Sequence, residues 1–292
     1  MSGYIGRFAP SPTGLLHIGS LIGALASYLD ARANQGRWLV RMEDLDPPRE
    51  MPGAASAILQ SLEDHGLIWD GEVLWQSQRH DVYRQVINDL LRANQAFYCT
   101  CSRRDLQQSK GIYQGRCRGR LTAPADQDFA CRLQVDNQSM AVDDAIQGHF
   151  SQQLEREVGD VILQRKDGLF AYQLAVVVDD AYQGITHIVR GADLLDSTPR
   201  QIYLQRVLGY TTPQYGHFPV ITDEQGEKFS KQTFATAIDS ADACNNLCLA
   251  LAFLQQPLPP VELCQQVEAI LAWAVQHWSI DSIPSELGIV KS

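Results

Sequence analysis

The sequence predicts an α/β fold built around a parallel sheet, and two observations carry that prediction. A helical pattern separates two short apolar segments at residues 4–9 and 38–43. That order makes a βαβ unit, from which parallel sheets are assembled. The chain has 292 residues, enough for one or two domains with a substantial core.

The first strand is expected at residues 4–9, because this segment is short, mostly apolar and bounded by Pro10. The Pro-Ser-Pro-Thr-Gly stretch that follows cannot be helical throughout and predicts a loop. From about Gly19 apolar residues recur at helical spacing, and Gly36 lies just past the expected helix end. Residues 38–43 are then expected to form the second strand.

Ligands of parallel sheets bind beyond the carboxyl ends of the strands, where the loop at residues 9–19 and Glu43 are expected. Gly14 and Gly19 leave room for a nucleotide to approach the backbone. The start of the helix offers N–H groups and a positive dipole to phosphate, and His17 can donate a hydrogen bond to it. These features favour a Rossmann-type nucleotide site, with an ordinary strand-to-helix turn as the alternative.

A second polar segment, residues 222–233, contains glycine and predicts a mobile loop. It carries Lys228 and Lys231, three residues apart. Such a loop can close over a triphosphate, where two lysines would stabilise charge as the α-phosphate is attacked and pyrophosphate leaves. Taken alone, this Lys-Phe-Ser-Lys segment is more typical of a solvated loop.

Arg190 is expected at the end of a strand, where a guanidinium can bind a carboxylate through two hydrogen bonds. Tyr172 can add a hydroxyl group. An acidic amino acid offers two carboxylates and an ammonium group. Arg7 and Arg190 suit the carboxylates, and Glu43 suits the ammonium. A surface ion pair is the simpler interpretation of Arg190 alone.

The remaining patterns divide the chain into three predicted parts. Residues 1–97 and 151–238 form a Rossmann-type catalytic domain, residues 98–150 form a small inserted subdomain, and residues 239–292 form a short helical C-terminal tail. The further expected elements are helices at 79–93 and 201–208, and strands at 160–165, 172–179 and 185–190 that return to the core sheet.

The inserted segment carries a cysteine pattern. Cys99, Cys101 and Cys117 could hold zinc, which prefers tetrahedral sulfur and nitrogen ligands. Tyr113 is the candidate fourth ligand by position and Cys131 is its rival, while cysteines in a loop without metal remain the alternative. Three further cysteines lie on apolar, helix-patterned stretches and are expected in the core: Cys244, Cys248 and Cys264.

The amino-acid composition limits the class of protein and the cellular location that can be expected. The formal net charge of −10 argues against a general nucleic-acid binder, which neutralises phosphate with Lys and Arg. No apolar run is long enough for a membrane span, and no secretory signal pattern opens the chain, so a cytoplasmic protein is expected. One local basic cluster stands out in the inserted segment: Arg103, Arg104, Lys110, Arg116, Arg118 and Arg120.

Several of these segments resemble class I aminoacyl-tRNA synthetases of the glutamyl branch. Residues 7–20 resemble the HIGH motif in its Arg-Phe-Ala-Pro-Ser-Pro-Thr-Gly form, and residues 227–232 resemble the KMSKS motif. Residues 41–46, 172–180 and 189–195 resemble other parts of the same catalytic domain. The last position of the HIGH-like motif is Ser20 rather than His, a position that varies in this branch.

The resemblance implies one site for glutamate and another for ATP with Mg²⁺. The implied glutamate-binding residues are Arg7, Ala9, Ser11, Glu43, Tyr172 and Arg190. The implied ATP-binding and catalytic residues are His17, Gly19, Lys228, Ser230 and Lys231.

The segment after residue 239 is too short for the large helical domain with which a glutamyl-tRNA synthetase reads the anticodon. The chain therefore resembles the glutamyl-Q tRNA(Asp) synthetase family. That family activates L-glutamate with ATP without needing tRNA, and attaches it to queuosine in the anticodon loop of tRNA(Asp). The resemblance also implies zinc on Cys99, Cys101, Tyr113 and Cys117, and we expect a monomer.

Three other interpretations stay open at this point. The first is a truncated glutamyl-tRNA synthetase that charges tRNA 3′ ends. The second is a small-molecule nucleotidyltransferase, against which the glutamate-pocket residues argue. The third is a zinc-bearing RNA-binding module with vestigial catalytic motifs.

Overall fold

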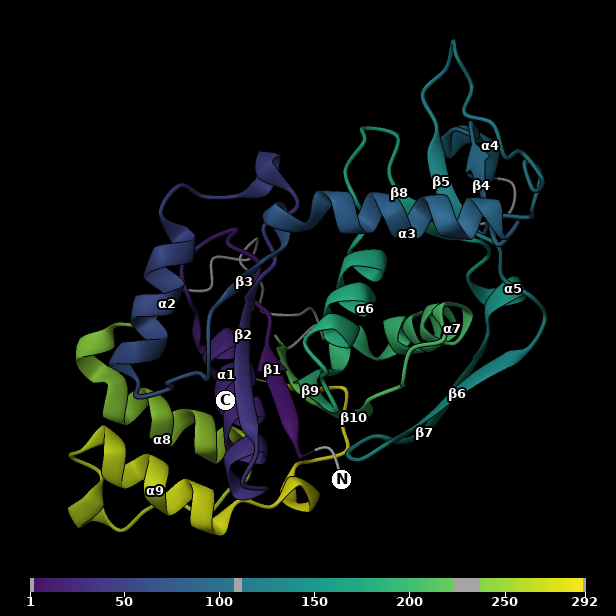
Figure 1. Cartoon of the computed structure of the whole chain (residues 1–292). Coiled ribbons are helices and arrows are strands. Elements are labelled where there is room, and N and C mark those ends of the chain that lie inside the picture. The colour runs from purple at the N-terminus through teal and green to yellow at the C-terminus, as the bar shows by residue number, and fades with distance from the viewer. Residues whose placement is uncertain (1–2, 108–111, 223–236, 291–292) are drawn as a thin grey trace.

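The computed structural model of this chain describes residues 3–107, 112–222 and 237–290. Lys228, Ser230 and Lys231 lie outside the described residues, as does Lys110. Within the described part, parallel strands are flanked by helices, and a smaller antiparallel sheet extends to one side (Figure 1).

The central strands are parallel, as the sequence predicted. β1 (Ile5–Phe8) pairs with β2 (Arg37–Met42), and β2 pairs with β3 (Leu74–Trp75). β9 (His187–Gly191) pairs with β10 (Gln214–Phe218). The backbone N–H just before β9 donates to the first carbonyl of β1 at 2.9 Å, so the two groups of strands lie next to each other. Their carboxyl ends therefore share one edge.

Helix α1 (Ile18–Ala33) begins and ends where its sequence predicts. His17 caps its start, and its apolar face is fully buried against the central strands. Gly36 permits the tight return into β2, because a Cβ there would lie 2.5 Å from the carbonyl oxygen of Tyr4. The loop after β1 and the start of α1 are thus fixed at the ligand-binding edge of the sheet.

The strand expected at residues 172–179 is wrong, because this segment is helix α6 (Tyr172–Tyr182). Residues 174–178 are all buried, since neighbouring elements cover α6 on several sides. A short apolar run of this kind does not distinguish a buried strand from a buried helix. The helical geometry places two acidic residues, Asp179 and Asp180, in the protein interior.

The strand expected at residues 160–165 exists but does not return to the core sheet. β8 (Val161–Gln164) pairs antiparallel with β5 (Ala130–Leu133), which pairs antiparallel with β4 (Ala96–Cys99). The strand pattern was correct, but periodicity carries no information about the partner strand. Beside this sheet, β6 (Ser139–Asp144) and β7 (Gly148–Gln153) form an antiparallel hairpin.

The other expected helices are confirmed as α3 (His80–Arg92) and α7 (Thr198–Leu208), and the expected strand at residues 185–190 is β9. The remaining elements are η1 (Pro47–Arg49), α2 (Ala54–Asp64), η2 (Gln76–Arg79), α4 (Arg103–Gln107), α5 (Leu154–Glu157), η3 (Ala192–Ser197), β11 (Val220–Thr222), η5 (Ser240–Asp242), α8 (Ala243–Phe253), η6 (Val261–Leu263), α9 (Val267–His277), η7 (Ile280–Ser282) and β12 (Gly288–Val290).

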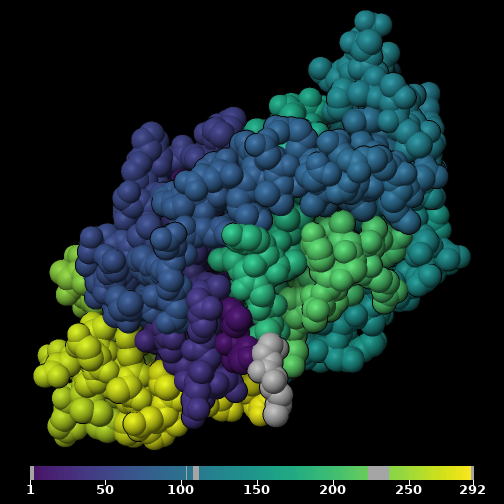
Figure 2. All heavy atoms as spheres, viewed as in Figure 1, coloured from purple at the N-terminus to yellow at the C-terminus, as the bar shows by residue number. Residues whose placement is uncertain are grey.

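The C-terminal helices complete the main core. α8 and α9 pack against α1, and the Trp278 indole donates to Asp30 on α1 at 2.8 Å. β12 pairs in parallel with β11, the strand that follows β10, and this pairing anchors the end of the described chain. The space-filling view shows this C-terminal part packed continuously against the N-terminal strands (Figure 2). Among the helices that the structure describes, none is long and apolar enough to cross a membrane.

Candidate active site

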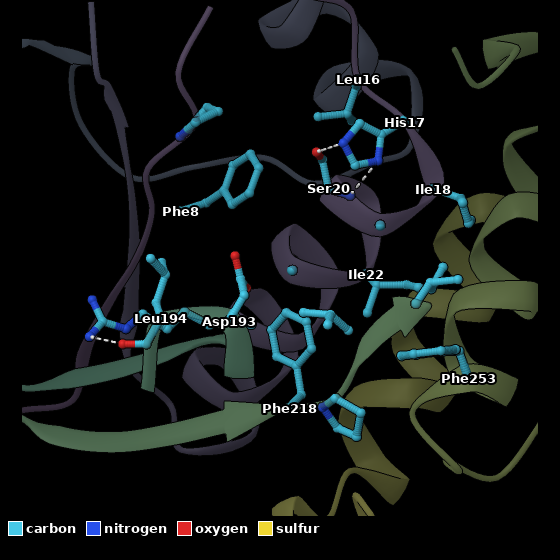
Figure 3. Close-up of a pocket in the computed structure, with 18 of the residues that line it drawn as sticks. Phe8, Leu16, His17, Ile18, Ser20, Ile22, Asp193, Leu194, Phe218 and Phe253 are labelled. Atoms are coloured by element: carbon cyan, nitrogen blue, oxygen red, sulfur yellow. Dashed lines mark hydrogen bonds between the residues drawn. The ribbon is translucent and has the colours of Figure 1, made fainter. Parts of the chain in front are cut away.

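A cavity of about 1520 Å³ opens at the carboxyl ends of the central strands (Figure 3). It combines polar groups from the loop after β1 with groups from β9 and α6. Every described residue that the family resemblance placed in the glutamate or ATP site lines it: Arg7, Ala9, Ser11, His17, Gly19, Glu43, Tyr172 and Arg190. The fold therefore brings these residues from distant parts of the sequence into one cavity. Gly14, which the sequence analysis expected beside the nucleotide, is not among the lining residues.

One side of the cavity is formed by the start of α1. The Ser20 backbone N–H donates to His17 Nδ1 at 3.3 Å, and the Ser20 hydroxyl lies 3.0 Å from His17 Nε2. A Cβ at Gly19 would lie 3.2 Å from the imidazole ring, so glycine leaves space for this ring position. The result is a helix N-terminus with small residues and a polar ring, which suits a phosphate group.

Arg190 lines another part of the cavity and is held by a buried polar network. Its Nε donates to His217 Nε2 at 2.9 Å, and its Nη2 donates to Gln201 at 2.8 Å and to Thr198 at 2.9 Å. Its Nη1 donates to the Tyr172 hydroxyl at 3.3 Å. With only 6% of the residue exposed, the guanidinium is fixed in one orientation.

Behind Arg190, His217 connects it to Asp144. Because the guanidinium can only donate, His217 Nε2 accepts, and the ring proton resides on Nδ1, which lies 2.5 Å from Asp144 Oδ2. Burial lowers the pKa of His217, and its hydrogen bond to Asp144 only partly opposes this. Burial alone would raise the pKa of Asp144, but the His217 hydrogen bond holds it below its usual value. At neutral pH this arrangement is therefore arginine cation, neutral imidazole and carboxylate.

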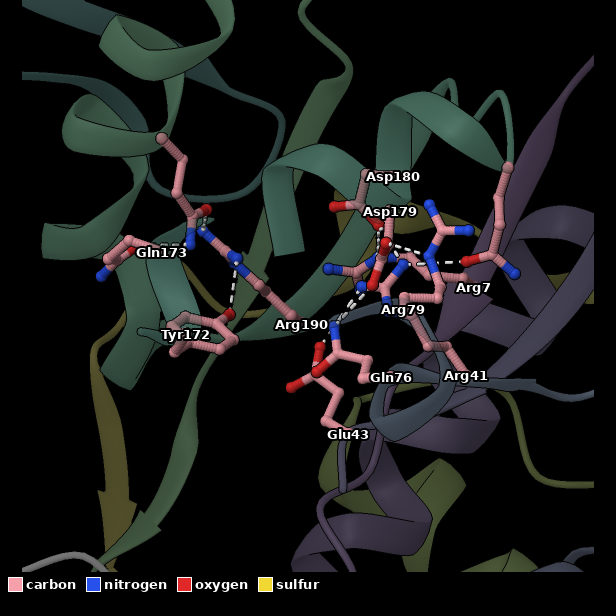
Figure 4. A network of polar contacts seen from close by, with 12 residues as sticks. Arg7, Arg41, Glu43, Gln76, Arg79, Tyr172, Gln173, Asp179, Asp180 and Arg190 are labelled. Carbon is pink, nitrogen blue, oxygen red and sulfur yellow. Dashed lines mark hydrogen bonds and ion pairs between the residues drawn. The ribbon is translucent and has the colours of Figure 1, made fainter. Parts of the chain in front are cut away.

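A second network lies beside the first and supports Arg7 and Glu43 (Figure 4). Asp180 on α6 accepts from Arg7 Nε at 3.3 Å and from Arg41 Nη1 at 2.7 Å. Arg41 Nη2 also donates to Glu43 at 3.3 Å. All four side chains are less than one-tenth exposed. Two buried cations are thus balanced by two buried carboxylates, as buried charges require.

The charges within this second network set its pKa shifts. Burial raises the pKa of Glu43, and the neighbouring Arg41 and Arg7 oppose that rise only in part. Burial would also raise the pKa of Asp180, but Arg41 and Arg7 together hold it below its usual value. Glu43 lines the cavity while Asp180 lies behind it. The more strongly stabilised carboxylate is therefore the structural one, and the other faces the ligand space.

The inserted region carries a cysteine cluster. The sulfur atoms of Cys99, Cys101 and Cys117 all lie within 4.8 Å of one another, and two of them are 3.6 Å apart. Tetrahedral zinc with zinc–sulfur distances of about 2.3 Å places sulfur atoms about 3.8 Å apart, so the cluster fits such an ion. The Tyr113 hydroxyl accepts from the Cys117 backbone N–H at 2.6 Å, which brings it to the same cluster.

The rival ligand, Cys131, lies elsewhere. It belongs to β5, is completely buried in a separate hydrophobic cluster, and its pKa is raised to about 12 by burial. Among the described residues, the metal-competent group contains only the three other cysteines of this region. The remaining cysteines, Cys244, Cys248 and Cys264, are half-buried rather than fully buried as expected.

Comparison with known proteins shows to which family this chain belongs. A model of the catalytic domain of class I tRNA synthetases (E and Q) matches residues 5–254. A glutamyl-Q tRNA(Asp) synthetase of Pseudomonas fluorescens is 53% identical over 292 residues, covering 100% of this chain and 97% of that protein. The chain belongs to the glutamyl-Q tRNA(Asp) synthetase family. It is therefore a ligase of the class I aminoacyl-tRNA synthetase type.

Two further comparisons agree with this family membership. A glutamyl-Q tRNA(Asp) synthetase of Neisseria meningitidis is 53% identical over 289 residues, covering 96% of this chain and 97% of that protein. A crystal structure of a glutamate tRNA ligase from Elizabethkingia meningosepticum, with its amino acid, superposes with a TM-score of 0.79 at 24% identity. The match covers 100% of this chain and 67% of that ligase, and it shows the shared class I fold.

For this member of the family, sequence reasoning missed the residues that hold the cavity in place. Asp180, Asp144 and His217 do not line the cavity among the described residues, yet they fix Arg7 and Arg190. Asp144 and His217 are separated by 73 positions and lie on different elements, so no local pattern relates them. The only signal was the presence of acidic and histidine residues within otherwise apolar stretches.

Proposed function

We propose that this ligase activates L-glutamate with ATP and then transfers the glutamyl group to queuosine in the anticodon loop of tRNA(Asp), in the cytoplasm and as a monomer. The observation that carries the proposal is the single cavity in which a helix N-terminus with His17 faces Arg190, Arg7 and Glu43. Relatives more than half identical to this chain bear the corresponding name.

Glutamate fits one side of the cavity by charge. Arg190 and Tyr172 present a guanidinium and a hydroxyl from the same hydrogen-bonded pair, which suits a carboxylate. Arg7 offers a second cation, and Ala9 and Ser11 bound the same space. Burial raises the pKa of Glu43, and an ammonium group that binds beside it would favour its charged form. The Arg190 and Arg7 cations would thus face the two carboxylates of glutamate, and the Glu43 carboxylate would face its ammonium group.

ATP fits the side formed by α1. The backbone N–H group at Gly19, together with His17, would bind phosphate oxygens, and Mg²⁺ would accompany the nucleotide. We assign Lys228, Ser230 and Lys231 to the same phosphates, although they lie outside the described residues. Little covalent chemistry by the protein is needed, because positioning and charge neutralisation supply most of the catalysis.

The reaction proceeds in two steps. The glutamate α-carboxylate attacks the α-phosphorus of ATP, which forms glutamyl-adenylate and releases pyrophosphate. A hydroxyl of the queuosine cyclopentene ring then attacks the activated carbonyl, loses its proton and releases AMP. The cavity has to remain open for a nucleotide of the RNA to reach the adenylate.

We propose zinc as the ion of the cysteine cluster, held by Cys99, Cys101, Cys117 and Tyr113. The backbone hydrogen bond that Tyr113 accepts from Cys117 would stabilise its oxygen as a ligand. The ion would have a structural role, since it lies in the inserted subdomain (residues 98–150) and not among the lining residues of the cavity. Residues 1–97 with 151–238 would form the catalytic domain, and residues 239–292 the helical tail.

The test is glutamate-dependent ATP–pyrophosphate exchange without tRNA, followed by transfer of labelled glutamate to tRNA(Asp) with and without queuosine. Exchange with queuosine-dependent transfer is the expected result. Exchange with transfer only to a 3′ end would instead indicate a truncated glutamyl-tRNA synthetase. Absence of exchange with any amino acid would refute the proposal and leave the nucleotidyltransferase and RNA-binding alternatives.

A further inference from the structure

We infer that a row of basic side chains between the mouth of the cavity and the cysteine cluster binds the phosphate backbone of the RNA substrate. The row, called the basic track below, consists of Arg49, Arg165, Lys166, Arg120, Arg116 and Arg104. All of them are exposed. The inference rests on the proposed function, because it specifies the surface on which that RNA would lie.

The track begins at the cavity. Arg49, a lining residue whose side chain is 68% exposed, binds the carboxylate of Asp46 at 2.5 Å. Arg165 binds the same carboxylate at 3.2 Å from the loop that follows β8. One aspartate thus holds two guanidinium groups from segments more than a hundred residues apart and draws them together at the cavity mouth. Arg165 also pairs with Asp167 at 2.5 Å.

The next residue continues the track to the cysteine cluster. Lys166 Nζ donates to the backbone carbonyl of Thr100 at 2.7 Å, and Arg120 Nη1 donates to the Thr100 hydroxyl at 2.9 Å. Thr100 lies between Cys99 and Cys101, so both cations are positioned by the cluster. In Figure 1 the loop after β8 lies in the upper part of the view, beside β5.

The far end of the track remains cationic. The Arg116 side chain is 77% exposed, and its nearest carboxylate, on Asp105, is 3.7 Å away. Arg104 is exposed on α4. Arg118, which the sequence placed in the same cluster, does not join the track, because Asp160 binds its guanidinium at 2.7 and 2.9 Å. The surface is therefore different from the cluster that the sequence suggested.

Charge explains why RNA would bind at this surface. Along the track six cations are contacted by three carboxylates, those of Asp46, Asp105 and Asp167, and two further carboxylates, Asp44 and Glu50, lie close to Asp46. The excess of positive charge on this chain of net charge −10 therefore lies toward Lys166, Arg120, Arg116 and Arg104. On helix α3, by contrast, the exposed arginines are matched one to one, Arg84 with Asp81 and Arg92 with Asp89. A polyanion is attracted where cations exceed carboxylates.

The position of the track favours RNA over an acidic protein partner. It ends at the cavity in which the proposed function places the activated glutamyl carbonyl. A phosphate backbone that follows the track would therefore bring a loop nucleotide to the reacting group, while the stem extends toward the cysteine cluster. Contacts to phosphate position the RNA and leave recognition of the base to the cavity.

The test compares the double variant Arg165→Gln/Lys166→Gln with the matched control Arg84→Gln/Arg92→Gln, which removes two exposed charges from α3. Binding of queuosine-containing tRNA(Asp) is measured by fluorescence anisotropy over a range of salt concentrations. We expect roughly tenfold weaker binding for the track variant at moderate salt, and a log–log salt slope smaller by about 2. Both variants should keep wild-type pyrophosphate exchange.

Equal affinity and equal salt slope for the two double variants would overturn the assignment. So would loss of pyrophosphate exchange in the track variant, since that result would place the effect in the active site. Unchanged tRNA binding with weaker binding of polyglutamate would assign the track to an acidic protein instead. If the wild-type protein transfers no glutamate, the proposed function fails, while the anisotropy comparison still decides whether the track binds RNA.

Discussion

The two sides of the active-site cavity are built in different ways. The side assigned to glutamate consists of charged side chains, each held by buried partners from other elements, as Arg190 is by His217 and Arg7 is by Asp180. The side assigned to ATP consists of a helix start, glycine and two polar residues that contact each other locally. Selecting one amino acid requires fixed charges, whereas phosphate binding needs mainly backbone N–H groups and space.

This comparison predicts that changes on the glutamate side cause large, selective losses, and changes on the ATP side cause small ones. The largest effect is expected for Arg190→Ala, because the variant removes a buried cation that is already oriented toward the ligand space. We expect kcat/KM for glutamate in pyrophosphate exchange to fall by about 10³-fold, which corresponds to roughly 4 kcal/mol. The KM for ATP should change little.

Arg190→Lys separates charge from geometry. Lysine keeps the positive charge but cannot donate to His217 and Gln201 in the same fork. We expect it to recover only a small part of the activity. A lysine variant with near wild-type kcat/KM would show that charge alone is sufficient and that the surrounding network has no role in orientation.

The second prediction concerns Asp180→Asn, which leaves Arg7 and Arg41 with less negative charge in a buried site. Breaking a buried ion pair costs about 3–5 kcal/mol, so the free energy of unfolding should fall by about 3 kcal/mol. Thermal or urea denaturation measures it. The matched control is Asp81→Asn, whose ion pair with Arg84 is exposed and should contribute less than about 0.5 kcal/mol. Equal losses in the two variants would contradict a special role for burial.

The separation in sequence between Asp180 and its partners also explains which site residues could be predicted from the sequence and which could not. His17 and Glu43 were found because one precedes a helix and the other ends a strand, and local patterns give those boundaries. Arg7 lies inside the first strand and was found from its charge and from the motif that it begins. Asp180 was not found, because the segment around it was assigned to a strand and its contacts reach back 139 and 173 positions. Such contacts depend on the tertiary packing of α6 against the sheet, which periodicity does not encode.

A third, smaller effect is expected at His217, which contacts Arg190 without lining the cavity among the described residues. His217→Gln should raise the KM for glutamate by about 10-fold while kcat changes less, because Arg190 loses a fixed acceptor. The ratio of the two effects distinguishes a positioning residue from a merely structural one. Asp144→Asn should act in the same direction, since it removes the carboxylate that fixes the His217 tautomer.

The same residue gives a prediction about pH. Because burial lowers the pKa of folded His217, the unfolded protein binds the proton more readily, and stability rises with pH across the interval between the two values. This contribution to the free energy of unfolding is complete above about pH 6.5, the pKa of histidine in the unfolded chain, and is lost as the pH falls toward the lower pKa of folded His217. We expect the KM for glutamate to rise as the pH falls into the acidic range below about 6.5, and His217→Gln to flatten that rise. An identical pH profile in the variant would assign the dependence to another group.

The smallest effect is expected on the ATP side, at Gly19. The added Cβ in Gly19→Ala would lie 3.2 Å from the His17 ring, which must then move by a few tenths of an ångström. The ring contacts Ser20 through both of its nitrogens, and we expect a shift of this size to raise the KM for ATP about threefold with the KM for glutamate unchanged. The measurement is pyrophosphate exchange at varied ATP concentration. A loss as large as that of Arg190→Ala would mean that the His17 ring is held as rigidly as the glutamate side, and the contrast between the two sides would no longer hold.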